Sequence, residues 1–203
     1  MVALVDADSR SGGMDLLLGA EDEPGVRWPE LANASGFIDP DALLAALPVA
    51  NDVSLLTWDD DVRDVSAVAM TSAVTALASR CDVVVVDLGR ARSDCVESLL
   101  PLTSLVVLVV PARVRGVAAA RRLLPILAPA SERLHVAVRM PSPGGLDPAD
   151  IQAALGLPSL GEVPHDARRA EHEENGLPPR VTGAWQRLAE AVLARCGTVG
   201  RAA

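Results

Sequence analysis

Acidic residues that could hold a metal ion stand at two places where a buried strand is expected to end. Asp6 and Asp8 follow the apolar run Val2–Val5, and Asp87 follows the run Val83–Val86. Carboxylate oxygens are ligands that a hydrated Mg²⁺ prefers, and they can also orient a water beside a phosphate. Open α/β sheets bind ligands at the carboxyl ends of their strands. These three carboxylates are therefore the candidate site, although a lone Asp-x-Asp at a strand end is more often only solvated.

The elements that position these residues follow from hydrophobic patterning, which predicts an α/β fold in one domain over residues 1–203. Continuous runs of valine and leucine predict strands that are buried on both faces, as in a parallel sheet. Over Ser66–Ser79, small and apolar residues that include Val68 recur at helical spacing and predict a helix packed on that sheet. Similar patterns predict strands over Val2–Val5, Val53–Trp58, Val83–Val86, Leu105–Val110 and Leu134–Val138, and helices over Met14–Leu18, Ala42–Leu47, Ser93–Leu100, Val114–Leu127, Asp147–Leu155, Ala167–Glu174 and Val181–Arg195.

Composition narrows the function classes. The chain has 203 residues and a formal net charge of −9. This charge disfavours a broad nucleic-acid surface, because neutralising phosphates requires concentrated positive charge. Arg115, Arg121 and Arg122 could form a DNA-binding patch, but arginines on a helix are more often a solvated face. No apolar run reaches the ~20 residues of a membrane-spanning helix. The three cysteines are widely spaced and fit a reducing cytosol.

Two further groups of metal-ligand residue types are weak candidates. The acidic run Asp59–Asp61 has no other ligand type converging on it, so we interpret it as a solvated loop. His165 and His172 lie near acids but lack a third ligand, which makes a poor metal site.

The basic residues limit phosphate chemistry. All 18 of them are arginine, and the sequence contains no lysine. A phosphate-binding loop uses a lysine to reach the β- and γ-phosphates of its nucleotide. We therefore expect that this chain alone does not bind ATP appreciably.

Several of these stretches resemble the MinD/ParA group of deviant P-loop ATPases. The run VDADSRSGGMDLLLG at 5–19 is similar to the group's second strand and following loop, VVVVDLG at 83–89 is similar to its Walker B strand, and GLPSLGEVPHD at 156–166 is similar to a strand and loop near its end. The resemblance implies a three-layer, mostly parallel P-loop NTPase fold that lacks its first strand and phosphate loop. In the group those parts precede the strand that Val2–Val5 resembles, so they would lie upstream of residue 1.

The resemblance also assigns roles to the carboxylates. If the upstream phosphate loop exists, the cofactor would be Mg-ATP, with Asp8 and Asp87 as magnesium and water ligands, Asp8 in the catalytic role and Asp6 as a supporting acid. Two features depart from the group. Leu88 and Gly89 replace its small-residue loop after Walker B, and Arg139 stands where ATP-binding relatives carry an adenine-reading asparagine. We therefore expect no cofactor and no ATPase activity in this form.

Most of the chain resembles one branch of the group, the CpaE/TadZ-like proteins of actinobacteria, which are often labelled septum site-determining proteins. This implies a role in positioning the division septum, or a Tad/type II secretion or pilus apparatus, with protein partners from that machinery. It allows a homodimer and peripheral association with the inner face of the membrane from a cytoplasmic location. An active ATPase of the chromosome- or plasmid-partition type is the alternative, and a truncated gene product without a role of its own is a third interpretation.

The resemblance carries a structural expectation. In a MinD-like sheet the phosphate-loop strand lies between the strands that correspond to Val83–Val86 and Leu105–Val110. Both runs are apolar throughout, so each should have a neighbour on both edges and cover on both faces. Without that central strand, we expect the chain alone to be poorly stable or to self-associate through exposed strand edges.

Overall fold

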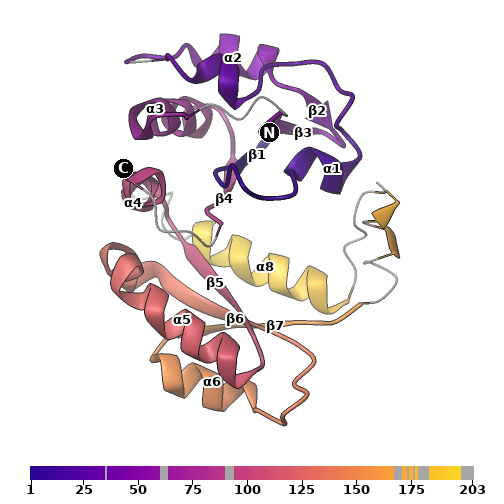
Figure 1. Ribbon diagram of the computed structural model, residues 1–203, viewed down its shortest axis with the longest axis vertical. Coiled ribbons are helices and arrows are strands. Elements are labelled where there is room, and N and C mark those ends of the chain that lie inside the picture. The colour runs from indigo at the N-terminus through magenta and orange to yellow at the C-terminus, as the bar shows by residue number, and fades with distance from the viewer. Residues whose placement is uncertain are drawn as a thin grey trace. The chain divides into compact units, whose positions relative to one another are not determined.

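The structure is a computed structural model that describes residues 1–34, 36–59, 64–89, 94–166, 171–172, 174–175, 177 and 183–197. Contacts divide the chain into two compact units, Met1–Leu99 with Arg168–Pro179, and Leu100–Ala167 with Arg180–Ala203. Both units combine mostly parallel strands with helices, which confirms the predicted α/β fold (Figure 1). The single domain expected over residues 1–203 stays a prediction. Residues 60 and 61 of the acidic run and most of the helix expected at 167–174 lie outside the described residues.

The first unit contains a four-stranded sheet in the order β2-β3-β1-β4. Strand β1 is central and pairs in parallel with β3 on one side and β4 on the other, while β2 joins β3 antiparallel. The strands are β1 Val2–Asp6, β2 Val49–Ala50, β3 Val53–Leu56 and β4 Val83–Asp87, and the helices are α1 Met14–Leu18, α2 Pro40–Ala46, α3 Ala67–Ala78 and α4 Asp94–Leu99, with a 3₁₀ helix over Trp28–Leu31.

Local sequence explains where the helices of this unit begin. Proline occupies the first position of α2, and Asp39 before it is the N-cap, since its side chain accepts hydrogen bonds from the backbone N–H groups of Asp41 and Ala42. Ser66 caps α3 in the same way through the N–H of Ala69. These side chains satisfy backbone donors that a helix start otherwise leaves without a partner.

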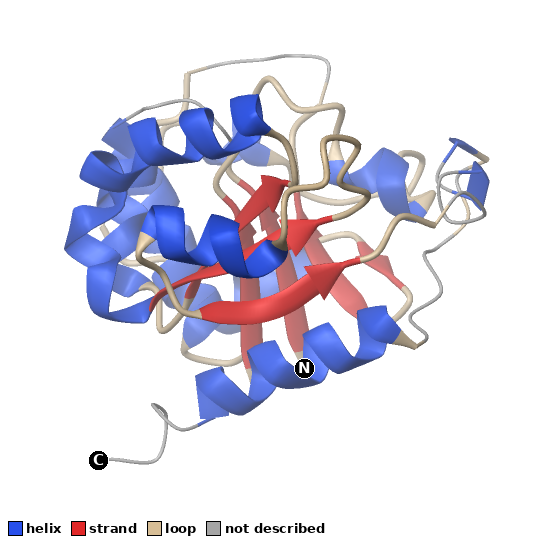
Figure 2. Cartoon of the chain, turned by 90° about the horizontal axis from the view of Figure 1, so that it is seen from below, coloured by secondary structure: helices blue, strands red, loops and turns tan. Residues whose placement is uncertain are grey.

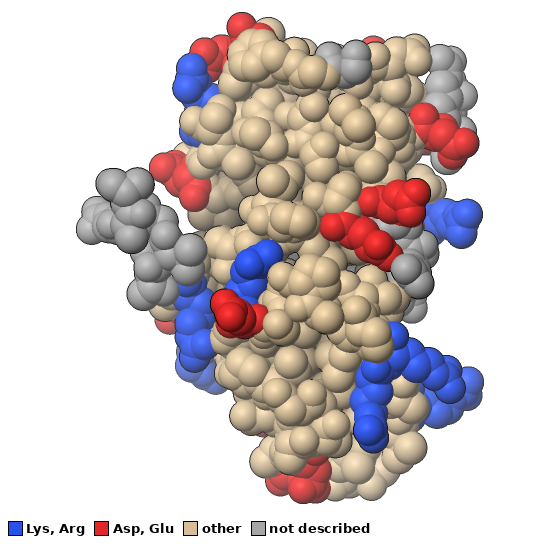
Figure 3. Space-filling view, turned by 90° about the vertical axis from the view of Figure 1, so that its left-hand side faces the viewer, with Lys and Arg blue, Asp and Glu red and all other residues tan. Residues whose placement is uncertain are grey.

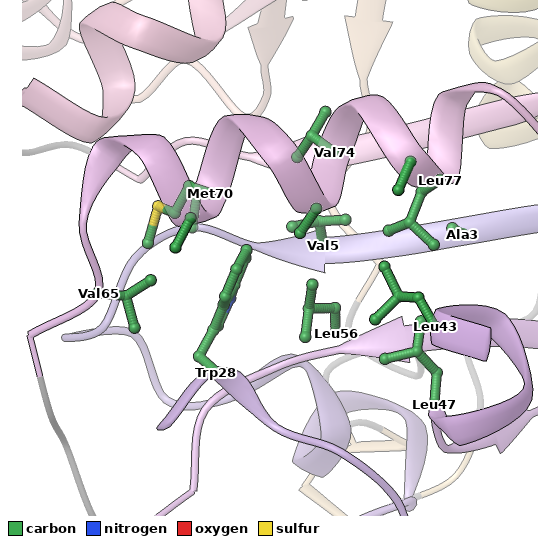
Figure 4. Close-up of a cluster of buried hydrophobic side chains, with 14 of the residues drawn as sticks. Ala3, Val5, Trp28, Leu43, Leu47, Leu56, Val65, Met70, Val74 and Leu77 are labelled. Atoms are coloured by element: carbon green, nitrogen blue, oxygen red, sulfur yellow. The ribbon is translucent and has the colours of Figure 1, made fainter. Parts of the chain in front are cut away.

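The core of the first unit lies between one face of the sheet and helices α2 and α3. Trp28 is fully buried there, and Figure 4 shows its ring standing between Val65 and Leu56 with Met70 of α3 beside it. Val5 and Leu77 continue the same cluster along β1 and α3. With so few aromatic residues, this indole fills the volume that smaller valine and alanine side chains leave.

The second unit contains three parallel strands in the order β5-β6-β7, namely β5 Val106–Pro111, β6 Leu134–Arg139 and β7 Ser159–Val163. Helices α5 (Val114–Leu127) and α6 (Pro148–Leu155) cover one face of this sheet, and α8 (Ala184–Gly197) covers the other (Figures 1 and 2). Two short 3₁₀ helices span Leu100–Leu102 and Ala128–Arg133. Residues Leu134 to Val138 of the central strand are all buried, as expected for a parallel strand with cover on both faces.

Two strands depart from their predicted burial. Strand β4 is the last strand of the first sheet and β5 is the last of the second, so among the described residues each has one strand neighbour. Val85 of β4 is 50% exposed and Val109 of β5 is 51% exposed. The prediction that both runs are buried on both faces is therefore wrong at Val85 and Val109, whereas a strand edge without a neighbour is what we expected in the absence of a central strand.

Candidate functional site

The three carboxylates of the predicted site lie at the C-terminal edge of the first sheet. The register of β1 with β4 places Asp6 directly beside Asp87. The backbone N–H of Ala7 then donates to the carbonyl of Asp87 at 2.9 Å, which extends the pairing by one residue and brings Asp8 past the end of β4. The expectation that these carboxylates leave two neighbouring strands at one edge follows from parallel pairing, and the geometry fits it.

Both carboxylate oxygens of Asp6 are used inside the protein. One accepts the Ser11 hydroxyl at 2.7 Å and the other accepts the backbone N–H of Asp8 at 3.0 Å. The residue is fully buried. Burial raises the pKa of Asp6, the two hydrogen bonds oppose this shift, and the charges of Asp87 and Asp8 add to it. Asp6 therefore shapes the turn after β1 rather than offering a free oxygen.

Two tryptophans hold the backbone of Asp6. The indole N–H groups of Trp28 and Trp58 both donate to the Asp6 carbonyl, at 2.6 and 3.1 Å, and the two rings lie 6.0 Å apart. The backbone N–H of Trp28 donates to the carbonyl of Thr57, so the end of β3 is tied to the same point. The position from which the acidic turn leaves the sheet is thus fixed by buried groups of two separate segments, Trp28 and Thr57–Trp58.

Asp8 and Asp87 each keep one oxygen that accepts no hydrogen bond from the described residues. The other carboxylate oxygen of Asp8 accepts a hydrogen bond from the backbone N–H of Arg10 at 3.1 Å. The other carboxylate oxygen of Asp87 accepts one from the backbone N–H of Gly89 at 2.9 Å. Gly89 has φ +65°, and a Cβ added there would lie 2.3 Å from the Asp8 carboxylate. Only glycine therefore lets the loop after β4 approach Asp8 this closely.

The fit of these residues to Mg-nucleotide is partial. Magnesium is typically bound through one or two carboxylates together with waters and substrate phosphates, and Asp8 and Asp87 supply that donor set. The phosphates need donors of their own, and a chain without lysine lacks the usual one. Asp8 and Asp87 are thus the residues that would hold the metal of such a complex, and its phosphates would need donors other than lysine.

Other residues that the sequence suggested do not form a metal site in the described parts of the chain. Among the described residues, no group of three or more histidine, cysteine, aspartate or glutamate residues is arranged to hold a metal ion, and this includes the set Asp6, Asp8 and Asp87. Arg115, Arg121 and Arg122 are exposed on α5. Nor does any described helix combine the length and apolar character needed to cross a bilayer.

Sequence reasoning missed the groups that support the site. Ser11 lies in the Ser/Gly-rich turn that follows Asp8. A serine in such a turn is only a weak indication that its hydroxyl forms a hydrogen bond with a nearby backbone group or carboxylate. Trp28 and Trp58 lie far from Asp6 in sequence. No local pattern indicates that their indoles meet one carbonyl, because that meeting depends on the strand order of the sheet.

Comparison with known proteins gives relatives of two kinds. No family model matches the chain. An uncharacterized protein of Mycobacterium tuberculosis, present in strains CDC 1551 and H37Rv, is 38% identical over 173 residues, which are 85% of this chain and 49% of the relative. The chain therefore spans about half the length of the curated relatives it matches.

Solved structures resemble the chain over nearly all its length. MinD of Aquifex aeolicus, in a MinC:MinD complex, has a TM-score of 0.74 at 18% identity and covers 100% of this chain and 84% of that chain. MinD of Pyrococcus horikoshii with Mg-ADP has a TM-score of 0.73 at 17% identity over 98% and 83%. A ParA family ATPase of Chlorobium tepidum has a TM-score of 0.73 at 15% identity over 97% and 82%. The chain has the fold of the MinD/ParA ATPases.

Proposed function

We propose that this chain is part of a CpaE/TadZ-like, septum site-determining positioning protein that places the division septum or a Tad/type II secretion or pilus apparatus. In this form it carries no ATPase activity. The observation that supports the proposal most is the pairing of Asp6 with Asp87 at the strand edge of a MinD/ParA fold. The relatives of that fold include cell-division and ParA-type proteins, and one is a complex with a second division protein.

The location and partners follow from the same role. The protein acts in the cytoplasm or at the inner face of the membrane, and it binds components of the division or pilus machinery, with a homodimer as its own assembly. A fluorescent fusion of the full-length protein in its native host tests this. We expect discrete foci at division sites or at the pilus apparatus. Uniform fluorescence through the cell, at native expression and with an intact fusion, would contradict a positioning role.

An active ATPase of the partition type, with its phosphate loop upstream, is the second candidate. It is favoured by the free oxygens of Asp8 and Asp87 and by the approach of Gly89. Calorimetry with Mg-ATP distinguishes the candidates. We expect no binding by the 203-residue chain, because it has no lysine, and a micromolar dissociation constant would overturn this expectation.

The role of Asp87 is tested in a longer protein that includes a phosphate loop. There we expect Asp87→Asn to weaken Mg-nucleotide binding at least tenfold, because a magnesium ligand loses its charge. Asp52→Asn is the matched control, since Asp52 is exposed and precedes β3 at the opposite edge of the same sheet. Equal binding by Asp87→Asn and the control would leave Asp87 as a strand end without a role in nucleotide binding.

A further inference from the structure

Helix α8 packs only shallowly on the second sheet. It lies along the face opposite α5 and α6, where a Cβ added to Gly161 of β7 would meet Leu188 of the helix at 3.9 Å. No residue from Ala184 to Cys196 is buried, whereas the central strand β6 is buried from Leu134 to Val138. Because helices in proteins are stabilised mainly by the apolar face that they bury, α8 gains little from packing. Single polar contacts therefore have a large share in keeping α8 on the sheet.

One such contact joins the central strand to the last turn of α8. His135 of β6 is buried, and its Nε2 atom lies within hydrogen-bond distance of Nη1 of Arg195. Its Nδ1 atom lies 3.2 Å from the carbonyl oxygen of Arg133. A carbonyl oxygen can only accept, so Nδ1 carries the proton of the neutral ring. Nε2 then has a free lone pair, and it accepts the hydrogen bond that Arg195 donates.

The contact can form in only one protonation state of the imidazole. Histidine is the side chain that ordinarily changes charge between about pH 5 and pH 8. A second proton on His135 would be carried by Nε2 and would point at the Arg195 guanidinium, which has donors only. The hydrogen bond would be lost, and two positive charges would meet at a partly buried position, where water screens them less than at the surface.

Few ionisable groups belong to the elements around His135. Strand β5 has none, and Glu162 of β7 pairs with Val138, which alternation places on the opposite face of the sheet from His135. The Arg133 guanidinium, just before β6, donates to the Leu100 carbonyl and lies 3.4 Å from the Thr103 hydroxyl. The remaining described groups are Glu132, which is exposed, Cys196 beside Arg195, and Glu190, which accepts a hydrogen bond from Gln186.

We propose that His135 and Arg195 form a pH-dependent switch. The C-terminal part of α8 stays on the second sheet while His135 is neutral, and it leaves the sheet when His135 is protonated, so that both positive charges reach water. The switch involves neither nucleotide nor any residue of the Asp8 and Asp87 edge. It therefore does not rest on the function proposed above.

Hydrogen exchange of the backbone amides in the full 203-residue chain tests the switch. The exchange is measured at pH 8 and pH 5.5 and corrected for the intrinsic rate at each pH. We expect the protection of the last two turns of α8 to fall about tenfold or more at pH 5.5, because a hydrogen bond to a charged group is lost and a like-charge contact replaces it. The protection of α5 and α6 should stay the same, since these helices cover the other face of the sheet.

Arg195→Gln is the decisive variant. A glutamine amide can donate to a neutral imidazole and accept from a protonated one, so the contact can form in both states. We expect α8 of this variant to keep its protection at pH 5.5. The matched control is Arg187→Gln, which removes one exposed arginine from the same helix and should keep the pH dependence of the parent. His165 and His172 are present in all three proteins, so their titration cannot distinguish the variants.

Three outcomes would overturn the proposal. The first is unchanged protection of α8 in the parent between the two pH values. The second is an equal loss in Arg195→Gln and Arg187→Gln, which would place the pH dependence elsewhere. The third is an equal loss across α5, α6 and α8, which would show unfolding of the whole second unit and not release of one helix. Both variants alter exposed side chains, so circular dichroism at pH 8 should show an unchanged fold.

Discussion

The ionisation of Asp6 is coupled to folding. Burial raises its pKa, so the folded chain holds the Asp6 proton more tightly than the unfolded chain does. Its contribution to stability is therefore fully present below the ordinary aspartate pKa and is lost as the pH rises through the raised pKa. Asp6→Asn has no carboxylate to ionise at this position, so its stability should not fall in the pH range between the ordinary and the raised aspartate pKa. The free energy of unfolding of the variant, relative to that of the parent, should therefore rise with pH across that range.

Urea unfolding of both proteins between pH 3.5 and pH 7 measures this difference. Ser11→Ala provides a second variant, because the serine hydroxyl lowers the pKa of Asp6. Its removal should shift the loss of stability to higher pH. If the curves of the parent and Asp6→Asn stay parallel over the whole range, the ionisation of Asp6 has no link to folding.

Trp28 combines core packing with a hydrogen bond to the turn of the site. Trp28→Ala should lower the free energy of unfolding by about 3–5 kcal/mol, the usual cost of emptying an aromatic site in a core. Trp28→Phe keeps most of the packing and loses only the indole N–H, for about 0.5–1.5 kcal/mol, because the Asp6 carbonyl still accepts from Trp58. Chemical denaturation of the two variants separates these effects, and equal losses would show that packing contributes little.

Of the candidate site, only the acidic residues could be predicted from the sequence. Asp8 and Asp87 follow apolar runs, and parallel strands end at a common edge, so their proximity could be inferred. The internal role of Asp6 could not be inferred, because it depends on the hydrogen bond from Ser11, on burial of the carboxylate, and on two indoles from distant segments that hold the Asp6 backbone. The demand for glycine at Gly89 likewise arises from a contact across strands that no local pattern encodes.

At the scale of elements, the open edges of β4 and β5 are the feature with the clearest consequence. Backbone N–H and C=O groups at such an edge can pair with another chain, and apolar side chains favour this. We expect the chain alone to self-associate in a concentration-dependent way, and Val85→Lys to reduce this. Val68→Lys is the matched control, because Val68 is 58% exposed on α3, away from any strand edge.

Light scattering over a range of protein concentrations measures the association. Equal reduction by both lysine variants would mean that added charge alone is responsible and that the β4 edge is not the contact. A chain that stays monomeric and melts cooperatively at high temperature would contradict the expectation and show that these edges are tolerated as they are.

Most elements were predictable, and the exceptions have physical reasons. Helices Met14–Leu18 and Val114–Leu127 begin and end where the pattern placed them. Strand β2 was missed, since two residues carry no periodicity. The buried face of α3 was assigned wrongly in part, because Val68 points to solvent while Met70 is buried. A helix that is apolar on most sides does not reveal by spacing which side meets the sheet.

At the scale of the whole molecule, charge decides what the chain can bind over a large area. Figure 3 shows acidic and basic side chains distributed over one face, with wide areas that carry neither. With a net charge of −9 we expect no mobility shift of duplex DNA at physiological salt and micromolar protein. A clear shift that weakens with added salt would contradict this and support a partition-type role for the α5 arginines.

The short hairpin formed by β2 and β3 limits how the first sheet can grow. Asn51 and Asp52, both with positive φ, form its tight turn, and the two-residue strand β2 occupies the outer side of β3. An edge this short offers little to a further strand. Two copies joined β4 to β4 about a twofold axis would thus use up the one long edge that each sheet presents. Association through this sheet would therefore give a closed dimer. A fibre would not form in this way, because no long strand edge would remain to bind a third copy.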